Sequence, residues 1–436
     1  MPVQHPPLEL NPDFQHALDL MEKSREHLFI TGRAGTGKST LLTLFRNTSH
    51  KKVIVLAPTG IAAINVKGQT IHSFFGFPPR LMQAHEIKKR KYRNLYRKID
   101  TIVIDEISMV RADILDHIDR FLRINRDNSA PFGGVQMIFF GDLFQLPPVV
   151  SSDVEKHYFS STYSSPYFFS SQILESGLSY RMVELRKIYR QEERHFIQLL
   201  EAIRTNSMDY DDLESLNERY QPTEQEEGPT ITLCSMNAIA DKINQARLAE
   251  LNGNMEEYRA NVTGDFHERL FPTEAFLALK TGAQVMLLKN DPNKKYVNGT
   301  IGKILRLLPD KIILGVEQED EKVEEIEVEK HEWEILKYNI NEKEDHKIES
   351  KVVGTFNQYP VKLAWAITIH KSQGKTFNRV MIDLGRGAFA HGQTYVALSR
   401  CRRLGGVTLK QRIKPRDIMI DERIVEYYEM MRRYST

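Results

Sequence analysis

The sequence predicts an α/β protein with two doubly wound parallel-sheet domains and a small β-rich insert in the second domain. Three observations lead to this fold class. The chain has 436 residues, which is enough for about three domains at roughly 150 residues each. Short apolar, β-branched runs alternate with segments long enough to form helices. A stretch in the C-terminal half alternates apolar and acidic residues, as an exposed antiparallel strand does.

The first domain is indicated by four apolar runs that are typical of parallel strands buried on both faces. They are "LFIT" (28–31), "KVIVLA" (52–57), "TIVID" (101–105) and "VQMIFF" (135–140). Each run is followed at once by Gly, Pro, Ser or acidic residues, so polar motifs fall at the carboxyl ends of strands, where open α/β sheets bind ligands. We expect this domain to span residues 1–175, with a small loop insert near residues 65–80.

The second domain is indicated by two further runs of the same kind, "TITLC" (230–234) and "RVMIDL" (379–384). Between them, "VEEIEVE" (323–329) predicts an exposed antiparallel strand, and "YVNGTIGKILRLL" (296–308) predicts a turn followed by a strand. We therefore expect the second domain over residues 176–255 and 357–436, interrupted by a β-rich insert at 256–356.

Composition excludes several classes of protein. The formal net charge is only +2, which does not indicate a globally basic chain. Cys234 and Cys401 have no metal-ligand spacing, which argues against a zinc site or a disulfide scaffold and suits a reducing compartment. No signal-peptide pattern and no apolar run of about 18 residues occurs, so we expect a soluble intracellular protein.

The segment "TGRAGTGKST" (31–40) has the spacing of a phosphate-binding loop between a strand and a helix. Gly35 and Gly37 permit close approach of the backbone to phosphate, so that successive N–H groups surround the anion. Lys38 is expected to reach the β- and γ-phosphates, and Ser39 to supply a ligand to Mg²⁺. The segment therefore predicts an ATP site that uses magnesium.

Two adjacent carboxylates follow the "TIVID" strand. Asp105 is expected to hold magnesium through water, and Glu106 to orient and deprotonate the attacking water. The alternative is that the pair only caps a helix, but its position beside a phosphate-binding loop favours catalysis. This arrangement predicts a hydrolase and not a passive nucleotide binder.

Three more residues are candidates for contacts with the γ-phosphate. Gln145 lies just beyond a strand in "GDLFQLPPV" (141–149), although glutamine in a turn is a weak signal by itself. Arg190 in "RKIYRQEERHF" and Arg400 in "YVALSRCRR" lie outside the first domain. An arginine supplied from another domain stabilises the charge that spreads over the transferred phosphoryl group. A surface salt bridge is the alternative for either arginine alone.

The ordered series of motifs resembles the superfamily-one DNA helicases. It comprises "GRAGTGKST", "APTGIAA", "GQTIHSFFGF", "IDEISMV", "PFGGVQMIFFGDLFQLPPV", "YRQEERHF", "AITIHKSQGKTF" and "YVALSR". The chain is similar in particular to the Pif (petite integration frequency) family, in the B branch that moves 5′ to 3′. The resemblance runs from about residue 8 to residue 410. It implies two RecA-like motor domains, a β-rich insert similar to an SH3 fold, and an ATP-dependent DNA helicase.

The resemblance also implies roles for individual residues. Gln15 resembles the glutamine that reads adenine ahead of the phosphate-binding loop. The implied ATP-binding set is Gln15, Gly35, Thr36, Gly37, Lys38, Ser39, Thr40, Gln373 and Gly374, the last two relaying between DNA and nucleotide. The implied DNA contacts are Thr59, Gly60, His72, Ser73, Phe74, Phe75, Val149, Thr368, His370, Lys371 and Ser372. Arg33 departs from the family, where a small residue or proline is usual.

Two segments keep alternative interpretations. The aromatic residues of "HSFFGFPPR" (72–80) could stack under bases or form the core of a small loop domain. The basic run "EIKKRKYRNLYRK" (86–98) could line the path of DNA or be a solvated face. The acidic run (317–334) is assigned to the insert, whose outer face we do not expect to contact DNA.

The implied function is translocation on single-stranded DNA and unwinding of forked or partial duplexes, in genome maintenance that includes repair, recombination and telomere maintenance. R-loops and G-quadruplex DNA are further candidate substrates. We expect a monomer, with dimerisation on DNA as the alternative, in the cytoplasm of a bacterium or phage host, with nuclear or mitochondrial locations left open. Three rivals remain: a translocase that does not separate strands, a nucleotide-gated DNA clamp, and an enzyme acting on RNA.

Overall fold

The structure is a computed structural model that describes residues 11–435, apart from residues 151, 223–228, 292–294, 318–321 and 341–347. The chain divides into two compact units. The first unit comprises Leu8–Tyr189, Glu334–Gly354 and Glu422–Thr436, and the second comprises Met1–Pro7, Arg190–Trp333 and Thr355–Asp421.

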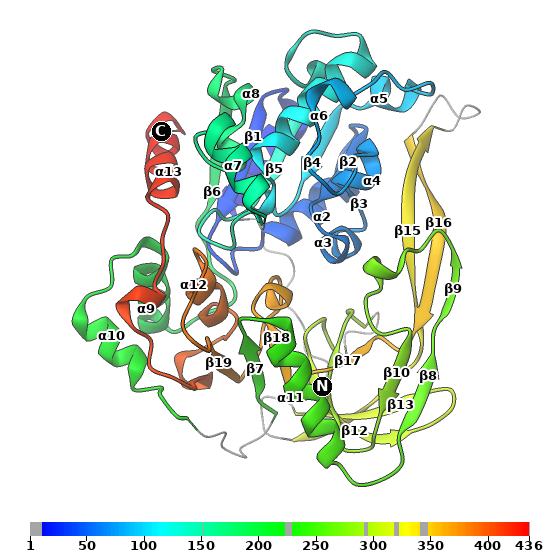
Figure 1. Cartoon of the computed structure of the whole chain (residues 1–436), viewed down its shortest axis with the longest axis vertical. Helices are drawn as coiled ribbons and strands as arrows, with labels where there is room; N and C mark the ends of the chain where they lie inside the picture. Colours follow the sequence, from blue (N-terminus) through cyan, green and yellow to red (C-terminus); the bar gives the residue numbers. More distant parts are fainter. Residues whose placement is uncertain are drawn as a thin grey trace. The chain divides into compact units, whose positions relative to one another are not determined.

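A six-stranded parallel sheet forms the centre of the first unit, in the order β3-β2-β4-β5-β1-β6 (Figure 1). Its strands are β1 (His27–Gly32), β2 (Val53–Ala57), β3 (Gln69–Thr70), β4 (Thr101–Ile104), β5 (Gln136–Phe140) and β6 (Tyr180–Leu185). All four strands predicted from apolar runs are present. The sheet also includes β3, which lies within the segment expected to be a loop insert, and β6, which lies beyond residue 175.

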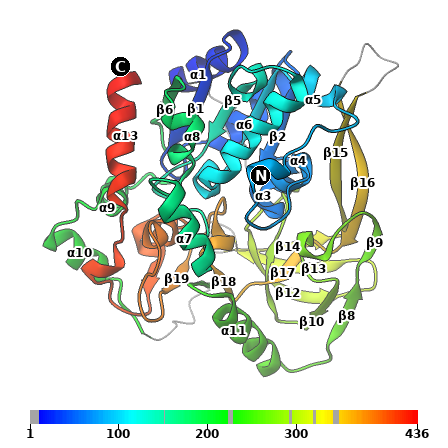
Figure 2. The same cartoon turned by 45° about the horizontal axis from the view of Figure 1, so that its top comes forward.

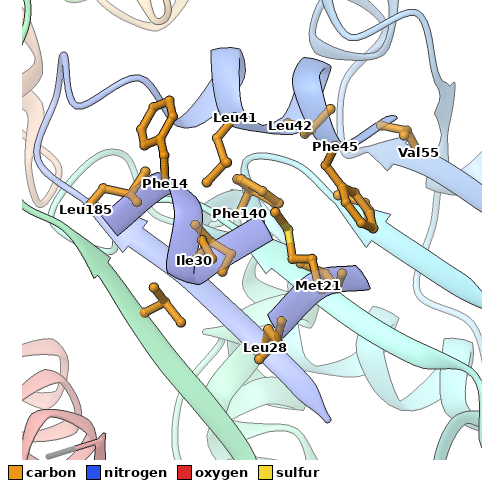
Figure 3. Close-up of a cluster of buried hydrophobic side chains, with 14 of the residues drawn as sticks. Phe14, Met21, Leu28, Ile30, Leu41, Leu42, Phe45, Val55, Phe140 and Leu185 are labelled. Carbon is orange, nitrogen blue, oxygen red and sulfur yellow. The ribbon is translucent and has the colours of Figure 1, made fainter. Parts of the chain in front are cut away.

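Both faces of this sheet are covered, as the doubly wound prediction requires. Leu28 and Ile30 belong to the same buried cluster as the apolar side chains of α1 and α2 (Figure 3). Phe29, between them, instead meets Phe168 edge-to-face, with ring centroids 5.6 Å apart. Because successive side chains of a strand point to opposite faces, packing partners exist on each side. The helices of the unit are α1 (Pro12–Lys23), α2 (Lys38–Thr48), α3 (Gly60–Asn65), α4 (Ile71–Phe75), α5 (Asn94–Lys98), α6 (Ala112–Arg126), α7 (Asp153–Thr162), α8 (Gln172–Glu175) and α13 (Glu422–Ser435).

Helix α13 corrects one boundary of the sequence prediction, which placed residues 357–436 in the second domain. The helix packs beside β6 in the first unit (Figure 1). The Tyr428 hydroxyl donates to Glu184 Oε1 at 2.5 Å, and the Tyr427 ring stacks on Phe169 with centroids 4.2 Å apart. The apolar side of this C-terminal helix is thereby buried against the sheet, although Glu184 and Tyr428 are 244 residues apart in the chain.

The second unit contains a four-stranded parallel sheet in the order β18-β7-β19-β20. Its strands are β7 (Ile231–Cys234), β18 (Ala366–Thr368), β19 (Val380–Asp383) and β20 (Val407–Leu409). The predicted runs at 230–234 and 379–384 form its two central strands. Its helices are α9 (Arg194–Thr205), α10 (Tyr210–Asn217), α11 (Asn237–Glu250) and α12 (Gln393–Leu398).

The predicted β-rich insert is present, and a five-stranded antiparallel sheet forms its core in the order β14-β13-β12-β11-β17. In β14, Ile326 and Val328 are buried while Glu325 and Glu327 are exposed, which confirms the alternation seen in the sequence. The strands between β7 and β18 are β8 (Glu256–Arg259), β9 (Asn261–Gly264), β10 (Phe276–Leu279), β11 (Gln284–Leu287), β12 (Ile301–Leu307), β13 (Ile312–Glu317), β14 (Val323–Val328), β15 (His331–Ile340), β16 (Ile348–Gln358) and β17 (Val361–Leu363).

One part of the expected insert, residues 334–354, belongs to the first unit and not to the second. The contact that holds it there is made by Tyr338 of β15. Tyr338 is 7% exposed, its hydroxyl accepts a hydrogen bond from the backbone N–H of Val55 at 3.3 Å, and its ring meets that of Phe74 edge-to-face at 6.0 Å. A buried tyrosine thus joins this segment to strand β2 and helix α4.

Candidate nucleotide and nucleic-acid sites

The phosphate-binding loop connects β1 to α2, as the sequence predicted. Two of its glycines have positive φ and leave no room for a side chain. At Gly32 (φ +149°) a Cβ would lie 2.6 Å from the Leu185 carbonyl oxygen, and at Gly37 (φ +84°) it would lie 2.8 Å from the Phe14 ring. The loop is therefore packed closely against Leu185 of β6 and Phe14 of α1, and glycine is required at both positions.

The N-terminus of α2 presents backbone donors without a side-chain cap. The ammonium group of Lys38, the first residue of the helix, donates to the carbonyl oxygens of Gly32 at 2.6 Å and Arg33 at 3.0 Å. Ser39 and Thr40 follow on the exposed side. A helix N-terminus with a lysine folded over the preceding turn is an anion site suited to the phosphates of a nucleotide.

The two predicted carboxylates lie where β4 ends. Asp105 directly follows the strand and is 8% exposed, and Glu106 has a left-handed backbone (φ +51°). Burial and the neighbouring Glu106 raise the pKa of Asp105 to about 7, while the charge of Lys38 acts in the opposite direction. Asp105 therefore interacts electrostatically with both Glu106 and Lys38, although the sequence predicted the lysine and the acids from separate motifs.

A magnesium ion fits this donor set. A buried aspartate beside a second carboxylate carries a repulsion that a divalent cation relieves, and a serine hydroxyl at the start of α2 is a further oxygen ligand. Ser39 and Asp105 are therefore the residues of this chain that would hold it. Among the described residues, no group of three His, Cys, Asp or Glu side chains could hold a metal ion.

Gln145 lies in the turn after β5, which is the strand between β4 and β1 in the sheet. Its side-chain amide donates to Asp142 Oδ2 at 3.3 Å, and both residues are buried. Because β4, β5 and β1 are parallel neighbours, Gln145, Asp105 and the phosphate-binding loop all emerge at the same edge of the sheet.

The predicted adenine contact, Gln15, is exposed on α1 and hydrogen-bonds to Asp19. The sequence reasoning missed the neighbouring Tyr189. Its backbone N–H donates to the Gly35 carbonyl at 2.9 Å, and its hydroxyl accepts from Asn11 Nδ2 at 2.7 Å. Asn11 also caps α1, because its side-chain oxygen accepts a hydrogen bond from the Phe14 N–H. The Asn-Pro pair in the sequence is a signal for such a helix start.

Arg190 and Arg400 come together in the second unit. Arg400, at the end of α12, is 2% exposed and donates to the Val396 carbonyl at 2.8 Å and the Ser399 hydroxyl at 2.8 Å. Arg190 donates to the Ser399 carbonyl at 3.1 Å. Burial, followed by the charge of Arg400, lowers the pKa of Arg190 to about 9. Gln191, which the sequence reasoning missed, donates to the same Ser399 carbonyl at 3.1 Å and fixes the turn.

The "TIHKSQG" motif forms a tight turn after β18. Thr368 accepts from the Lys371 backbone N–H at 3.3 Å, and the Ser372 hydroxyl donates to the Ile369 carbonyl at 2.7 Å. These two hydroxyls hold the turn, while Lys371 is exposed and His370 is partly exposed. Within the described chain, the side-chain nitrogen of Gln373 is buried without a hydrogen-bond partner, which suits a residue that relays to a ligand.

Two lysines that the sequence reasoning missed surround this turn. Burial and the charge of Lys371 lower the pKa of Lys362. Burial, followed by the charge of Lys362, lowers the pKa of Lys375 to about 8, and its ammonium donates to Asn298 Oδ1 at 2.7 Å. Lys362 carries no sequence signal, because only the folding of β17 brings it near Lys371, whereas Lys375 lies within the quoted motif "AITIHKSQGKTF" and was not assigned a role.

The predicted DNA contacts of the first unit separate into exposed and buried sets. Thr59 caps α3 ahead of Gly60, and Ser73 accepts from Gln69 Nε2 at 3.1 Å, while both side chains remain exposed. Val149 is 60% exposed after the buried turn at 141–148. His72 is partly exposed, and burial and the charge of Arg111 lower its pKa.

Phe74 and Phe75 do not present their rings to solvent, so the prediction that they stack on bases is corrected. Phe74 is 6% exposed and Phe75 is fully buried. The Phe75 ring stacks with that of Phe77 at 5.2 Å and meets that of Phe121 edge-to-face at 5.2 Å. Phe74 likewise meets Phe75 and Tyr96 edge-to-face, so the alternative of a small loop core describes these residues.

No helix within the described residues is long and apolar enough to cross a membrane. Comparison with known proteins identifies the family. A family model described as PIF1-like helicase matches residues 10–213, and one described as the 2B domain of DNA helicase Pif1 matches residues 268–307. The ATP-dependent DNA helicase Pif1 of Bdellovibrio bacteriovorus is 31% identical over 442 residues, covering 98% of this chain and 93% of the relative.

Other relatives are longer than this chain. The human ATP-dependent DNA helicase PIF1 is 32% identical over 94% of this chain, which spans 62% of the length of the human protein. The crystal structure of Bacteroides sp Pif1 in complex with ADP-AlF4 is similar with a TM-score of 0.90 and 36% identity, covering 98% of each chain. With this similarity over nearly the whole of both chains and on the same fold, the chain belongs to the PIF1-like family of ATP-dependent DNA helicases.

Proposed function

We propose that this protein is an ATP-driven motor that moves 5′ to 3′ along single-stranded DNA and separates the strands of duplex DNA ahead of it. The proposal rests on one observation: the residues that would bind the nucleotide and the arginines that would contact its γ-phosphate belong to different units. The first unit groups Lys38, Asp105 and Glu106 at the edge of one sheet, and the second unit holds Arg190 and Arg400 side by side at Ser399.

The first unit would bind the nucleotide. The N–H groups at the start of α2 and the Lys38 ammonium bind the phosphates, with Ser39 and Asp105 holding Mg²⁺, which neutralises phosphate charge when it is bound. Glu106 accepts a proton from the attacking water, and Gln145 contacts the γ-phosphate. Gln15 contacts the base.

The second unit would sense the γ-phosphate. Two neighbouring guanidinium groups repel one another, and a terminal phosphate relieves that repulsion when they close onto it. Hydrolysis and release of phosphate remove the attraction between these arginines and the nucleotide, so that the units separate. If each unit holds the strand independently, the cycle of closure and opening becomes a step along DNA.

The DNA contacts would come from both units. In the first unit they are Thr59, Gly60, His72, Ser73 and Val149. In the second they are His370 and Lys371, whose turn is held by the buried hydroxyls of Thr368 and Ser372, with Gln373 and Gly374 coupling DNA to nucleotide. Hydroxyls and cations of this kind contact phosphates without reading sequence. A similar protein from Bacteroides has been crystallised bound to single-stranded DNA, which supports this partner for the present chain.

The finer features of the proposal follow the family resemblance. Forked DNA is the leading substrate, since a solved Pif1 structure, 36% identical to this chain, concerns unwinding at forked double-stranded DNA by two coordinating Pif1 helicases. R-loops and G-quadruplexes are candidates, and genome maintenance is the setting. We propose a monomeric, cytoplasmic motor whose antiparallel insert is the SH3-like domain.

The decisive experiment compares unwinding of matched 5′-tailed and 3′-tailed duplexes with ATP. We expect the 5′-tailed substrate alone to be separated, and ATPase activity to rise steeply with single-stranded DNA. ATPase without separation of either substrate would identify a translocase. A single turnover would identify a nucleotide-gated clamp, and greater stimulation by RNA would identify an RNA enzyme.

A further inference from the structure

The basic loop at residues 86–98 of the first unit is not used by any part of the proposed motor. It contains seven basic side chains between Lys88 and Lys98. Lys88 and Lys91 are exposed, and Tyr92 is 82% exposed. The loop leads into α5, which packs against α6 (Figure 2).

The loop is fixed to the protein at defined points. The Arg90 guanidinium donates to the Phe75 carbonyl at 2.7 Å and lies over the Phe121 ring at 5.7 Å. Gly76 (φ +66°) makes room for this arginine, because a Cβ there would lie 2.4 Å from Arg90 Nη2. The basic loop is therefore anchored to α4, the helix that carries the proposed single-strand contacts His72 and Ser73.

Most of the charge on the loop is not neutralised. In the described part of the chain, Asp127 is the one carboxylate within ion-pair distance of the seven basic groups, and it pairs with Lys89 at 2.6 Å, Arg93 at 2.5 Å and Arg97. The ion pairs lower the pKa of Asp127 to about 2. Other exposed lysines of this unit have their own partners, as Lys23 has Asp19 and Lys156 has Asp153.

We propose that Lys88, Lys91 and Tyr92 form a second DNA-binding surface, which holds the phosphodiester backbone of the duplex beside the single-strand site. Lysine ammonium groups on flexible stems bind phosphates of any sequence as point charges. The loop exposes one aromatic ring, Tyr92, with the Lys91 ammonium 5.4 Å from its ring centre, so it offers charge to phosphates but no series of rings on which unpaired bases could stack. The chemistry favours duplex DNA, and the proposal rests on the DNA function proposed above.

The test compares two variants of the full-length chain. Lys88→Ala/Lys91→Ala/Tyr92→Ala removes the surface, and Lys23→Ala/Lys156→Ala removes the same charge from α1 and α7. Binding to a single strand, a blunt duplex and a fork is measured by fluorescence anisotropy over a range of salt. We expect the first variant to lose tenfold or more in affinity for duplex and fork, and its salt slope to fall by about 1.8 for two lost phosphate contacts. Its affinity for single strands, and all binding by the control, should stay unchanged.

Several results would overturn the proposal. An equal loss for the single strand would place the loop in the single-strand site, and no loss on any substrate would make it a solvated face. Wild-type protein that binds single strands but not duplex would exclude the surface and leave the proposed motor standing. Absence of all DNA binding by the wild type would overturn both proposals. Unchanged thermal melting of both variants shows that the fold is intact.

Discussion

Arg190 and Arg400 are oriented by one residue: the Ser399 carbonyl accepts from Arg190 at 3.1 Å, and the Ser399 hydroxyl accepts from Arg400 at 2.8 Å. The serine and Arg190 are 209 positions apart in the chain. Burial, followed by repulsion from the charge of Arg400, lowers the pKa of Arg190. Such a pair is suited to a ligand of high negative charge, and a terminal phosphate is the ligand that the proposed function supplies.

Replacing Arg190 tests this pair. We expect Arg190→Ala to reduce DNA-stimulated ATP turnover by about 10³-fold or more, because the charge of the transition state loses a cation. Single-strand affinity should be unchanged. Steady-state ATPase and anisotropy measure the two quantities, and Arg194→Ala, an exposed arginine four residues away, is the matched control. Unchanged turnover would remove Arg190 from the site.

Replacing Lys38 tests the nucleotide site of the first unit. Lys38→Ala should abolish ATPase activity and strand separation, because the phosphates lose their ammonium partner. Single-strand binding should remain, since the Lys38 ammonium lies at the phosphate-binding loop, where it donates to the Gly32 and Arg33 carbonyls. Binding of a fluorescent nucleotide and a forked-duplex assay measure the losses. Substantial strand separation by this variant would refute the motor.

Replacing Phe75 separates core packing from base stacking. Phe75→Ala should lower the free energy of unfolding by about 3–5 kcal/mol, because a fully buried ring leaves a cavity. Phe75→Leu should restore most of that stability and bind single strands as the wild type does. Denaturant unfolding and anisotropy give the two readouts. A stable Phe75→Leu protein with weak DNA binding would reinstate the stacking interpretation.

His331 gives the second unit a defined pH dependence. Its ring Nδ1 lies 2.9 Å from the Lys289 ammonium, and burial, followed by that charge, lowers the pKa of His331 to about 4. His331 takes up a proton near pH 6.5 in the unfolded chain and near pH 4 in the folded chain. The free energy of unfolding is therefore highest above pH 6.5 and decreases as the pH falls from 6.5 to about 4. We expect a loss of about 1–2 kcal/mol, allowing for screening at a half-exposed site.

The His331 effect is measured by denaturant unfolding at pH 7 and pH 5, with Trp333 as the reporter. Its ring centroid lies 4.9 Å from that of His331, and Trp365→Phe removes the other tryptophan. His331→Gln should flatten the pH dependence, because an amide oxygen accepts from Lys289 without titrating. An equal slope in that variant would assign the titration to another group.

The strands and the phosphate-binding loop were predictable because their signals are local. Continuous β-branched runs indicated β1, β2, β4 and β5, and glycine spacing indicated the turn before Lys38. Strand β6 was missed because "YRMVEL" (180–185) at the sheet edge includes the exposed Arg181 and half-buried positions, and so has no continuous apolar run. Helix α13 was assigned to the wrong unit because its partner Glu184 precedes it by 244 residues.

The sequence by itself determined the class of sheet, the nucleotide site and the family, since each depends on residues close together in the chain. Only the tertiary structure decided which side chains share an environment. It buried Phe74 and Phe75 and brought Arg190 beside Arg400. It also placed Lys362 near Lys371, and left the charge of the basic loop with a single carboxylate. Burial and charge pairing depend on contacts between distant segments, and spacing along the chain does not encode those contacts.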